Sequence, residues 1–148
     1  MRGILIDIFS NKALQAGILS WFIAQFIKIL IVLVTEKKFD VTRFIGAGGM
    51  PSSHSAFVSS LTTVIGIIDG FNSSNFAISL TFALIVMYDA AGVRREAGKQ
   101  AQTLNYLIES FFSTYIKHDP KLKELIGHKP IEVFAGSILG IVIALLLV

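Results

Sequence analysis

The chain has 148 residues, of which 53% are hydrophobic and 16% are charged, and its mean hydropathy is +0.71. Soluble domains carry about 25% charged residues, so this composition excludes an ordinary soluble domain and indicates a protein that folds in lipid. The absence of cysteine excludes disulfides, iron–sulfur clusters and thiol catalysis, and the net charge of +3 does not predict a nucleic-acid partner, because the basic residues flank hydrophobic stretches.

Four apolar stretches approach the length needed to cross a membrane, for which about 20 residues suffice. They run from Ala13 to Val34, from Ser52 to Ile68, from Asn75 to Val93 and from Ile131 to Val148. The second and third are short, but a thinner bilayer or snorkelling flanks accommodate such spans. Residues 1–148 are therefore expected to form a single all-α membrane domain, a polytopic bundle of about four transmembrane helices.

An amphipathic segment lies between the third and fourth stretches. Its apolar residues recur at helical spacing and face away from the polar ones. The apolar residues are Leu104, Leu107, Ile108, Phe111, Phe112 and Tyr115. This pattern predicts a helix that lies along the membrane interface.

Most basic residues fall on one side of a four-span topology, the side of the loop 35–51 and of the linker before the last stretch. They are Lys37, Lys38, Arg43, Arg94, Arg95, Lys99, Lys117, Lys121, Lys123 and Lys129, whereas the other side has Arg2 and Lys12. The positive-inside rule makes the basic side cytoplasmic and turns both termini outward, in what we expect to be a bacterial cytoplasmic membrane. A site for anions would recruit the same cations, so both explanations stay open.

The first candidate motif is GGMPSSHSA, residues 48–56, where the second stretch begins. Pro51 suits a helix start, and Ser52 or Ser53 can cap the helix, whose free amides would point at an anion. His54 would then lie in the first turn beside that anion. The alternative is a well-capped helix with a surface histidine.

The second motif is GHKPIEV, residues 127–133, where the last stretch begins. If the helix includes His128, Glu132 lies on the same face and can orient the imidazole as a nucleophile. Pro130 is accepted in a first turn, yet it can leave His128 outside the helix. Glu132 would otherwise be an interfacial carboxylate paired with Lys129.

The third motif is YDAAGVRREAGKQA, residues 88–101. The planar guanidinium groups of Arg94 and Arg95 suit phosphate, and Lys99 shares a helical face with Arg95. Asp89 lies near the membrane boundary and needs a cation or polar partner. Positive-inside anchoring alone would also explain the two arginines.

Gln25 and Lys28 share one face of the first stretch and are expected to face the bundle. Hydrogen bonding between helices and a role in substrate binding are equally compatible with them. His118 falls in a polar linker and is expected to be solvated.

PSSHSA, residues 51–56, resembles the histidine motif of the type 2 phosphatidic acid phosphatase and vanadium haloperoxidase superfamily. His128 followed by Glu132 resembles its nucleophile motif, which usually has Asp in the second position. With GVRREAG, residues 92–98, the pattern is similar to the small divergent branch of that superfamily, from Trp21 onward.

Two departures from the usual superfamily pattern are visible. The basic cluster follows the PSSH element instead of preceding it, and Lys121 and Leu122 stand where a serine–arginine pair usually precedes the nucleophile. Lys123 or Arg43 is available to substitute for that arginine.

The resemblance implies an integral membrane phosphatase that hydrolyses a lipid phosphate or pyrophosphate through a phosphohistidine, with no metal and no cofactor. His128 would attack phosphorus, Glu132 would orient it, and His54 would protonate the leaving oxygen and then activate water. The implied phosphate-binding set comprises Ser52, Ser53, Arg94, Arg95, Lys99, Arg43 and Asp89.

Four alternatives are considered at this point. The same anion site would serve a non-catalytic protein that binds or transports phospholipid headgroups, and four short spans would serve an assembly subunit. Metal binding by Asp89, Glu96 and Glu132 is the third. Vanadate-dependent halide oxidation is the fourth and is not expected, because the oxidases of the superfamily are soluble. Expected partners are a lipid phosphate and membrane lipids, and homo-oligomerisation is left open.

Overall fold

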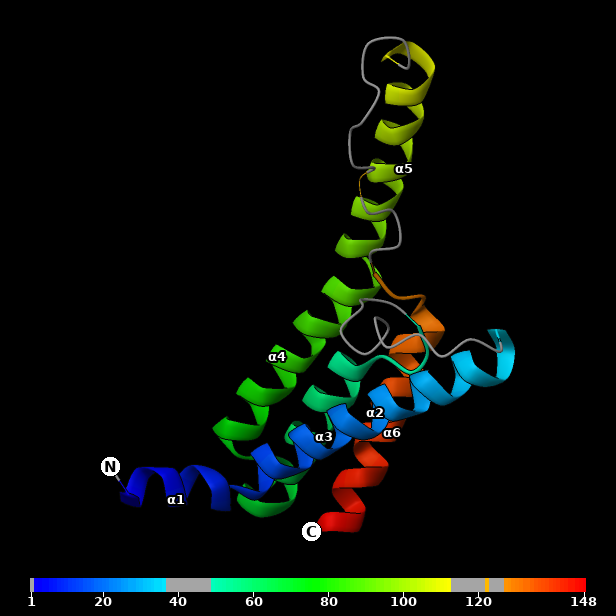
Figure 1. Cartoon of the computed structure of the whole chain (residues 1–148). Coiled ribbons are helices and arrows are strands. Elements are labelled where there is room, and N and C mark those ends of the chain that lie inside the picture. Colours follow the sequence, from blue (N-terminus) through cyan, green and yellow to red (C-terminus); the bar gives the residue numbers. More distant parts are fainter. Residues whose placement is uncertain (1, 37–48, 113–121, 123–126) are drawn as a thin grey trace.

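The computed structural model describes residues 2–36, 49–112, 122 and 127–148, and this part of the chain forms six helices (Figure 1). They are α1 (Arg2–Ser10), α2 (Lys12–Glu36), α3 (Ser53–Asp69), α4 (Ser74–Ala91), α5 (Val93–Phe112) and α6 (Pro130–Leu147). The prediction of an all-α fold is confirmed.

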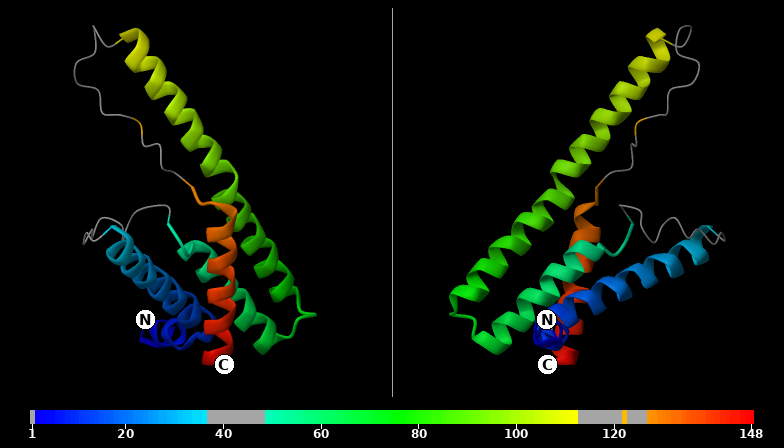
Figure 2. Two further views of the ribbon diagram at one scale, coloured as in Figure 1. Left: turned by 90° about the vertical axis from the view of Figure 1, so that its right-hand side faces the viewer. Right: turned by 60° about the vertical axis from the view of Figure 1, so that its left-hand side comes forward.

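The centre of the bundle is α3, which packs against α2, α4 and α6 (Figure 2). Gly136 and Gly140 bring α6 close to α3: a Cβ atom at either position would overlap the backbone carbonyl of Ser52 or Ala56, respectively. Small residues spaced in this way let helices approach closely where lipid supplies no hydrophobic driving force. The starts of α3 and α6 are therefore held side by side.

The polar residues of the bundle face inward on α3. Its serines and threonines are largely buried, and Thr62 Oγ1 donates to the carbonyl of Ser79 on α4 at 3.1 Å. Ser59 and Ser137, on α3 and α6, are hydrogen bonded at 3.0 Å. Large apolar side chains instead stay exposed on the outside, for example Ile78 and Leu146, which is the arrangement expected for a protein solvated by lipid.

Three helical stretches in the described residues are long and apolar enough to cross a membrane: Lys12–Thr35, Ser74–Phe111 and Pro130–Leu147. Three of the four predicted spans are thus supported. The remaining one, 52–68, does form a helix, but α3 has only 17 residues and is rich in serine and threonine. Its length of about 25 Å falls short of a hydrocarbon core of about 30 Å.

The helix expected from the amphipathic pattern is α5, which begins after a break at Gly92. It continues nearly in the direction of α4 and projects beyond the bundle (Figures 1 and 2). Its predicted place along the membrane interface stays a prediction. The two ends of the chain, in α1 and at the end of α6, lie at the opposite end of the bundle from α5 (Figure 1).

Candidate functional site

Three chain segments converge at the α5 end of the bundle. The amide of Ser52 donates to the carbonyl of Glu132, and the amide of His128 donates to the carbonyl of Ala90, both at 2.9 Å. Gly127, with φ of +103°, passes so close to the backbone of Arg95 that a Cβ atom would overlap it. These contacts bring the motif segments 51–56, 88–101 and 127–133 together at one place.

His128 and Glu132 form a hydrogen-bonded pair, with Nδ1 and Oε2 3.0 Å apart. The same carboxylate oxygen accepts the amide of Lys129 at 3.1 Å, so Glu132 also caps α6. The helix begins at Pro130, so His128 lies outside it, and the spacing argument based on a continuous helix does not apply. The pair forms across the helix cap instead.

The environment of His128 favours a neutral ring. Its side chain is only 3% exposed, and burial lowers its pKa below the ordinary value, while the hydrogen bond to Glu132 acts in the opposite direction. Because a carboxylate can only accept, Nδ1 carries the proton and Nε2 keeps its lone pair. A neutral imidazole with a free Nε2 is the form that can act as a nucleophile.

The second histidine approaches the first from the start of α3. The ring centroids of His54 and His128 lie 6.5 Å apart, with an angle of 60° between the planes. His54 is exposed, whereas His128 is buried. A phosphate group placed between two rings at this separation would be within reach of both.

The start of α3 is fixed by its serines. Ser52 caps the helix, accepting the amide of Ser55 at 3.3 Å and its hydroxyl at 3.0 Å. Because the Ser52 amide donates to Glu132, the first-turn amides with no acceptor inside the helix are those of Ser53 and His54. Ser52 thus positions α3 against α6, and the amides of Ser53 and His54 are the donors that remain for an anion.

Lys28 is a buried cation at the site. Only 4% of the residue is exposed, and its Nζ donates to Ser53 Oγ at 3.4 Å. Its charge and that of Arg94 both act to lower the pKa of His128. From the sequence, Lys28 was expected to face the bundle, but helix packing and substrate binding were equally compatible with it. A lysine within an apolar span is the sequence feature that indicated a buried role.

Asp89 and Arg94 pair across the α4–α5 break, with Arg94 Nε donating to Asp89 Oδ2 at 2.7 Å. The partner that Asp89 needs near a membrane boundary is therefore this arginine. The charge of Arg94 acts on His128, whose pKa it lowers, and the N–H groups of the guanidinium other than Nε are suited to phosphate oxygens.

The other basic candidates are placed differently. Lys99 lies further along α5, where its Nζ is 2.6 Å from Glu96 Oε1, and it is grouped with that carboxylate and not with the histidines. Arg95 is exposed, with its backbone against Gly127. Arg43 lies outside the described residues.

The three carboxylates considered for metal binding have separate partners: Asp89 with Arg94, Glu96 with Lys99 and Glu132 with His128. Within the described ranges, no group of three or more metal-ligating side chains is present.

The chain belongs to the Divergent PAP2 family, which matches residues 9–143. The resemblance predicted from the two histidine motifs is therefore confirmed. A relative from Bacillus subtilis (strain 168), the uncharacterized membrane protein YuiD, is 42% identical over 153 residues, which cover 96% of this chain and 97% of the relative. With three candidate spans and this bacterial relative, the chain is a membrane protein. No solved structure matches it.

Proposed function

We propose that this protein is an integral membrane phosphatase that hydrolyses a lipid phosphate or diphosphate through a phosphohistidine. The observation that carries the proposal is the buried His128, oriented by Glu132 at 3.0 Å, with the His54 ring 6.5 Å from its own. This is a nucleophile with its orienting group and a second proton-transfer group on the far side of the phosphate position.

The reaction proceeds in two steps. Nε2 of His128 attacks phosphorus, the P–O bond to the lipid breaks, and His54 gives its proton to the leaving oxygen. His54 then takes a proton from water, whose oxygen attacks phosphorus; the P–N bond breaks, and inorganic phosphate leaves. With a lipid diphosphate, the leaving group of the first step is the lipid monophosphate.

The negative charge that spreads over the phosphate oxygens requires preorganised donors. Arg94, held by Asp89, and Lys28, held beside Ser53, supply cations, and the amides of Ser53 and His54 supply neutral donors. Arg94 can take the place of the arginine that the superfamily pattern puts before the nucleophile. Arg95, Lys99 and Arg43 stay as predicted ligands.

The same proposal includes the topology. We infer that α3 crosses the membrane as a fourth span, because α2, α4 and α6 shield its polar face. The basic end with the histidines then faces the cytoplasm, and α5 follows the membrane interface or leaves it. The substrate is a lipid phosphate drawn from the surrounding bilayer.

Alanine substitution of the three histidines tests the proposal. His128→Ala should abolish phosphate release from lipid phosphates by the purified protein, and His54→Ala should lower it by about a hundredfold or more. His118→Ala, at the remaining histidine of the sequence, is the matched control and should leave release unchanged. Undiminished release from the His128 or the His54 variant would contradict the mechanism.

A second candidate function is headgroup binding without chemistry. It is favoured by the lack of the usual serine–arginine pair, in whose places Lys121 and Leu122 stand. Labelled lipid phosphate separates the two functions: a phosphatase acquires acid-labile, base-stable phosphate, whereas a binding protein retains the intact lipid.

A further inference from the structure

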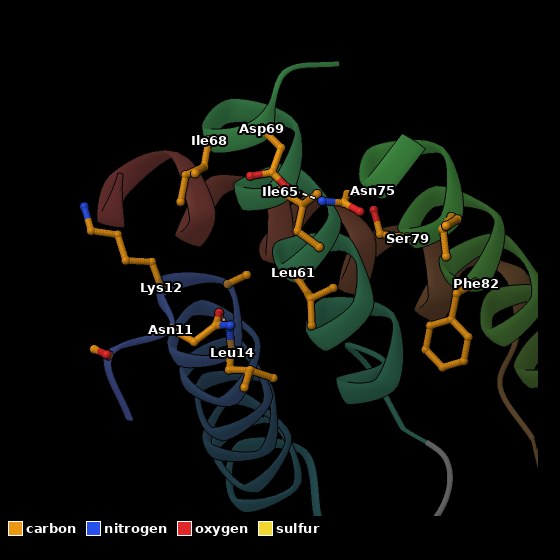
Figure 3. Close-up of a pocket in the computed structure, with 13 residues that line it drawn as sticks. Asn11, Lys12, Leu14, Leu61, Ile65, Ile68, Asp69, Asn75, Ser79 and Phe82 are labelled. Atoms are coloured by element: carbon orange, nitrogen blue, oxygen red, sulfur yellow. Dashed lines mark hydrogen bonds between the residues drawn. The ribbon is translucent and has the colours of Figure 1, made fainter. Parts of the chain in front are cut away.

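Two hollows follow α3 in the space between α2 and α4. The first, of about 420 Å³, is lined by His54 and six apolar side chains: Ile18, Trp21, Phe57, Val58, Phe82 and Val86. The second, of about 720 Å³, lies toward the other end of α3, beside Leu61, Ile65 and Asp69 (Figure 3). Phe82 lines both hollows, which lie one after the other along α3, and we call the two together the α3 furrow.

The α3 furrow lies between two helices whose backbones are separated. Both α2 and α4 pack closely against α3, but in the described part of the chain their backbones do not come close to one another. The floor is therefore α3 and the walls are α2 and α4. Within the bilayer, such an opening admits a hydrocarbon chain directly from the side.

The two ends of the furrow differ in chemistry. One end carries His54, which faces the proposed phosphate position. The other carries Lys12 and a hydrogen bond of 2.8 Å from Asn75 Nδ2 to Asp69 Oδ2 (Figure 3). An apolar chain in the furrow should end before these polar side chains, which limits its length.

The length of the furrow indicates how long a chain it accepts. His54 and Ile68 line its two ends on a single helix, which at about 1.5 Å per residue gives about 21 Å. Half of a hydrocarbon core of about 30 Å is about 15 Å. The furrow therefore extends beyond one leaflet, and a chain that filled it would pass the Phe82 ring at the junction of the hollows.

We propose that the α3 furrow binds one hydrocarbon chain of the lipid phosphate and that Phe82 determines how long a chain is accepted. This inference rests on the proposed function, because the phosphate group is placed at His54. A short chain occupies only the hollow next to His54. A longer chain passes Phe82 and enters the hollow beside Asp69.

Chain-length selectivity tests the role of Phe82. In Phe82→Trp, hydrolysis of hexadecyl phosphate should fall about tenfold relative to decyl phosphate, which corresponds to about two methylene groups kept out of the furrow. Phe26→Trp is the matched control: Phe26 has a similar exposure, 61% against 57%, and lines neither hollow. An unchanged ratio in Phe82→Trp, or an equal change in Phe26→Trp, would overturn the proposal.

Trp21 gives a readout that does not depend on catalysis, because it is the single tryptophan of the chain and lines the hollow next to His54. Hexadecyl phosphate brominated near the middle of its chain should quench Trp21 fluorescence at about a tenth of the mole fraction needed by phosphatidylcholine brominated at the same depth. Unlabelled decyl phosphate should reverse the quenching.

Equal quenching by both brominated lipids would mean that bulk lipid fills the furrow, and no quenching by either would mean that a second copy of the chain covers it. Both results overturn the proposal. If wild-type protein hydrolyses no lipid phosphate but Trp21 is quenched selectively, the phosphatase mechanism fails and the chain site stands. Hydrolysis without selective quenching gives the reverse conclusion.

Discussion

The two ends of α3 carry similar residue types in different surroundings. At the histidine end, Lys28 is 4% exposed and His128 is 3% exposed. At the other end, Lys12 and Asp69 are exposed, and the partner of Asp69 is the neutral Asn75. Burying a cation or an imidazole costs free energy unless partners compensate. The histidine end carries this cost of burial, and the other end, where the charged groups are exposed, does not. Buried and paired groups, more than charge itself, distinguish the proposed site.

Neutralising one carboxylate at each end tests this difference most strongly. Glu132→Gln should lower hydrolysis of decyl phosphate by about a hundredfold, because a neutral amide orients His128 less well and no longer stabilises developing positive charge on it. Asp69→Asn, the same change at the other end of α3, should leave that rate within about twofold, because a decyl chain ends before Asp69. Phosphate release from the two purified variants measures this difference, and equal losses in both would contradict it.

The same pair of variants makes a prediction about pH. His128 must be neutral to attack, and burial lowers its pKa, so the acid limb of kcat/KM should lie below the ordinary histidine value of about 6.5. The hydrogen bond to Glu132 raises that pKa, and its loss in Glu132→Gln should move the limb to still lower pH. A limb that moved upward, or that moved equally in Asp69→Asn, would contradict the assignment.

The two lysines sharpen the comparison further. Lys28→Met should lower phosphate release about tenfold, the size expected for one charge-assisted hydrogen bond, without lowering the midpoint of thermal unfolding, because a buried cation is removed from an apolar span. Lys12→Met should change neither the rate with decyl phosphate nor the midpoint. If Lys28→Met only destabilised the protein and kept its rate, Lys28 would be a packing residue.

The close approach of α3 and α6 is tested by Gly140→Leu. The added side chain meets the carbonyl of Ala56, and such overpacking typically costs about 1–3 kcal/mol. The midpoint of thermal unfolding should fall. Phosphate release should fall as well, because the close approach of α3 and α6 also positions Ser52 against Glu132. Gly3→Leu is the control, since nothing lies within 4 Å of a Cβ atom there; an equal loss in both variants would contradict the packing argument.

The smallest effect is expected from Ser137→Ala, which removes the 3.0 Å hydrogen bond to Ser59. Hydrogen bonds between membrane helices contribute about 0.6 kcal/mol on average. Thr81→Val, where the hydroxyl bonds only within its own helix, is the control. An unfolding free energy that did not differ between the two would leave the glycines as the main α3–α6 contact.

The sequence predicted the helical class, the family and the two histidine motifs, because each is encoded within a few consecutive residues. It could not predict that Gly127 would pass against the backbone of Arg94 and Arg95, or that the His128 amide would donate to the carbonyl of Ala90. Helical spacing placed Lys99 on the same face as Arg95 and predicted that both bind phosphate, but Lys99 pairs with Glu96 one turn earlier on α5. Local patterns identified the groups that we propose to react, while the surroundings of the cations depended on contacts between distant segments.

The central claim is a covalent phosphohistidine on His128. Wild-type protein quenched in alkali within the first turnovers of a labelled lipid phosphate should carry base-stable, acid-labile label, and peptide mapping should place it on His128. Because His54 assists both steps, His54→Ala should form the same adduct and lose it again more slowly than the wild-type protein, and His128→Ala should carry none. Label on another residue, or lipid phosphate hydrolysis by His128→Ala at the wild-type rate, would contradict the account.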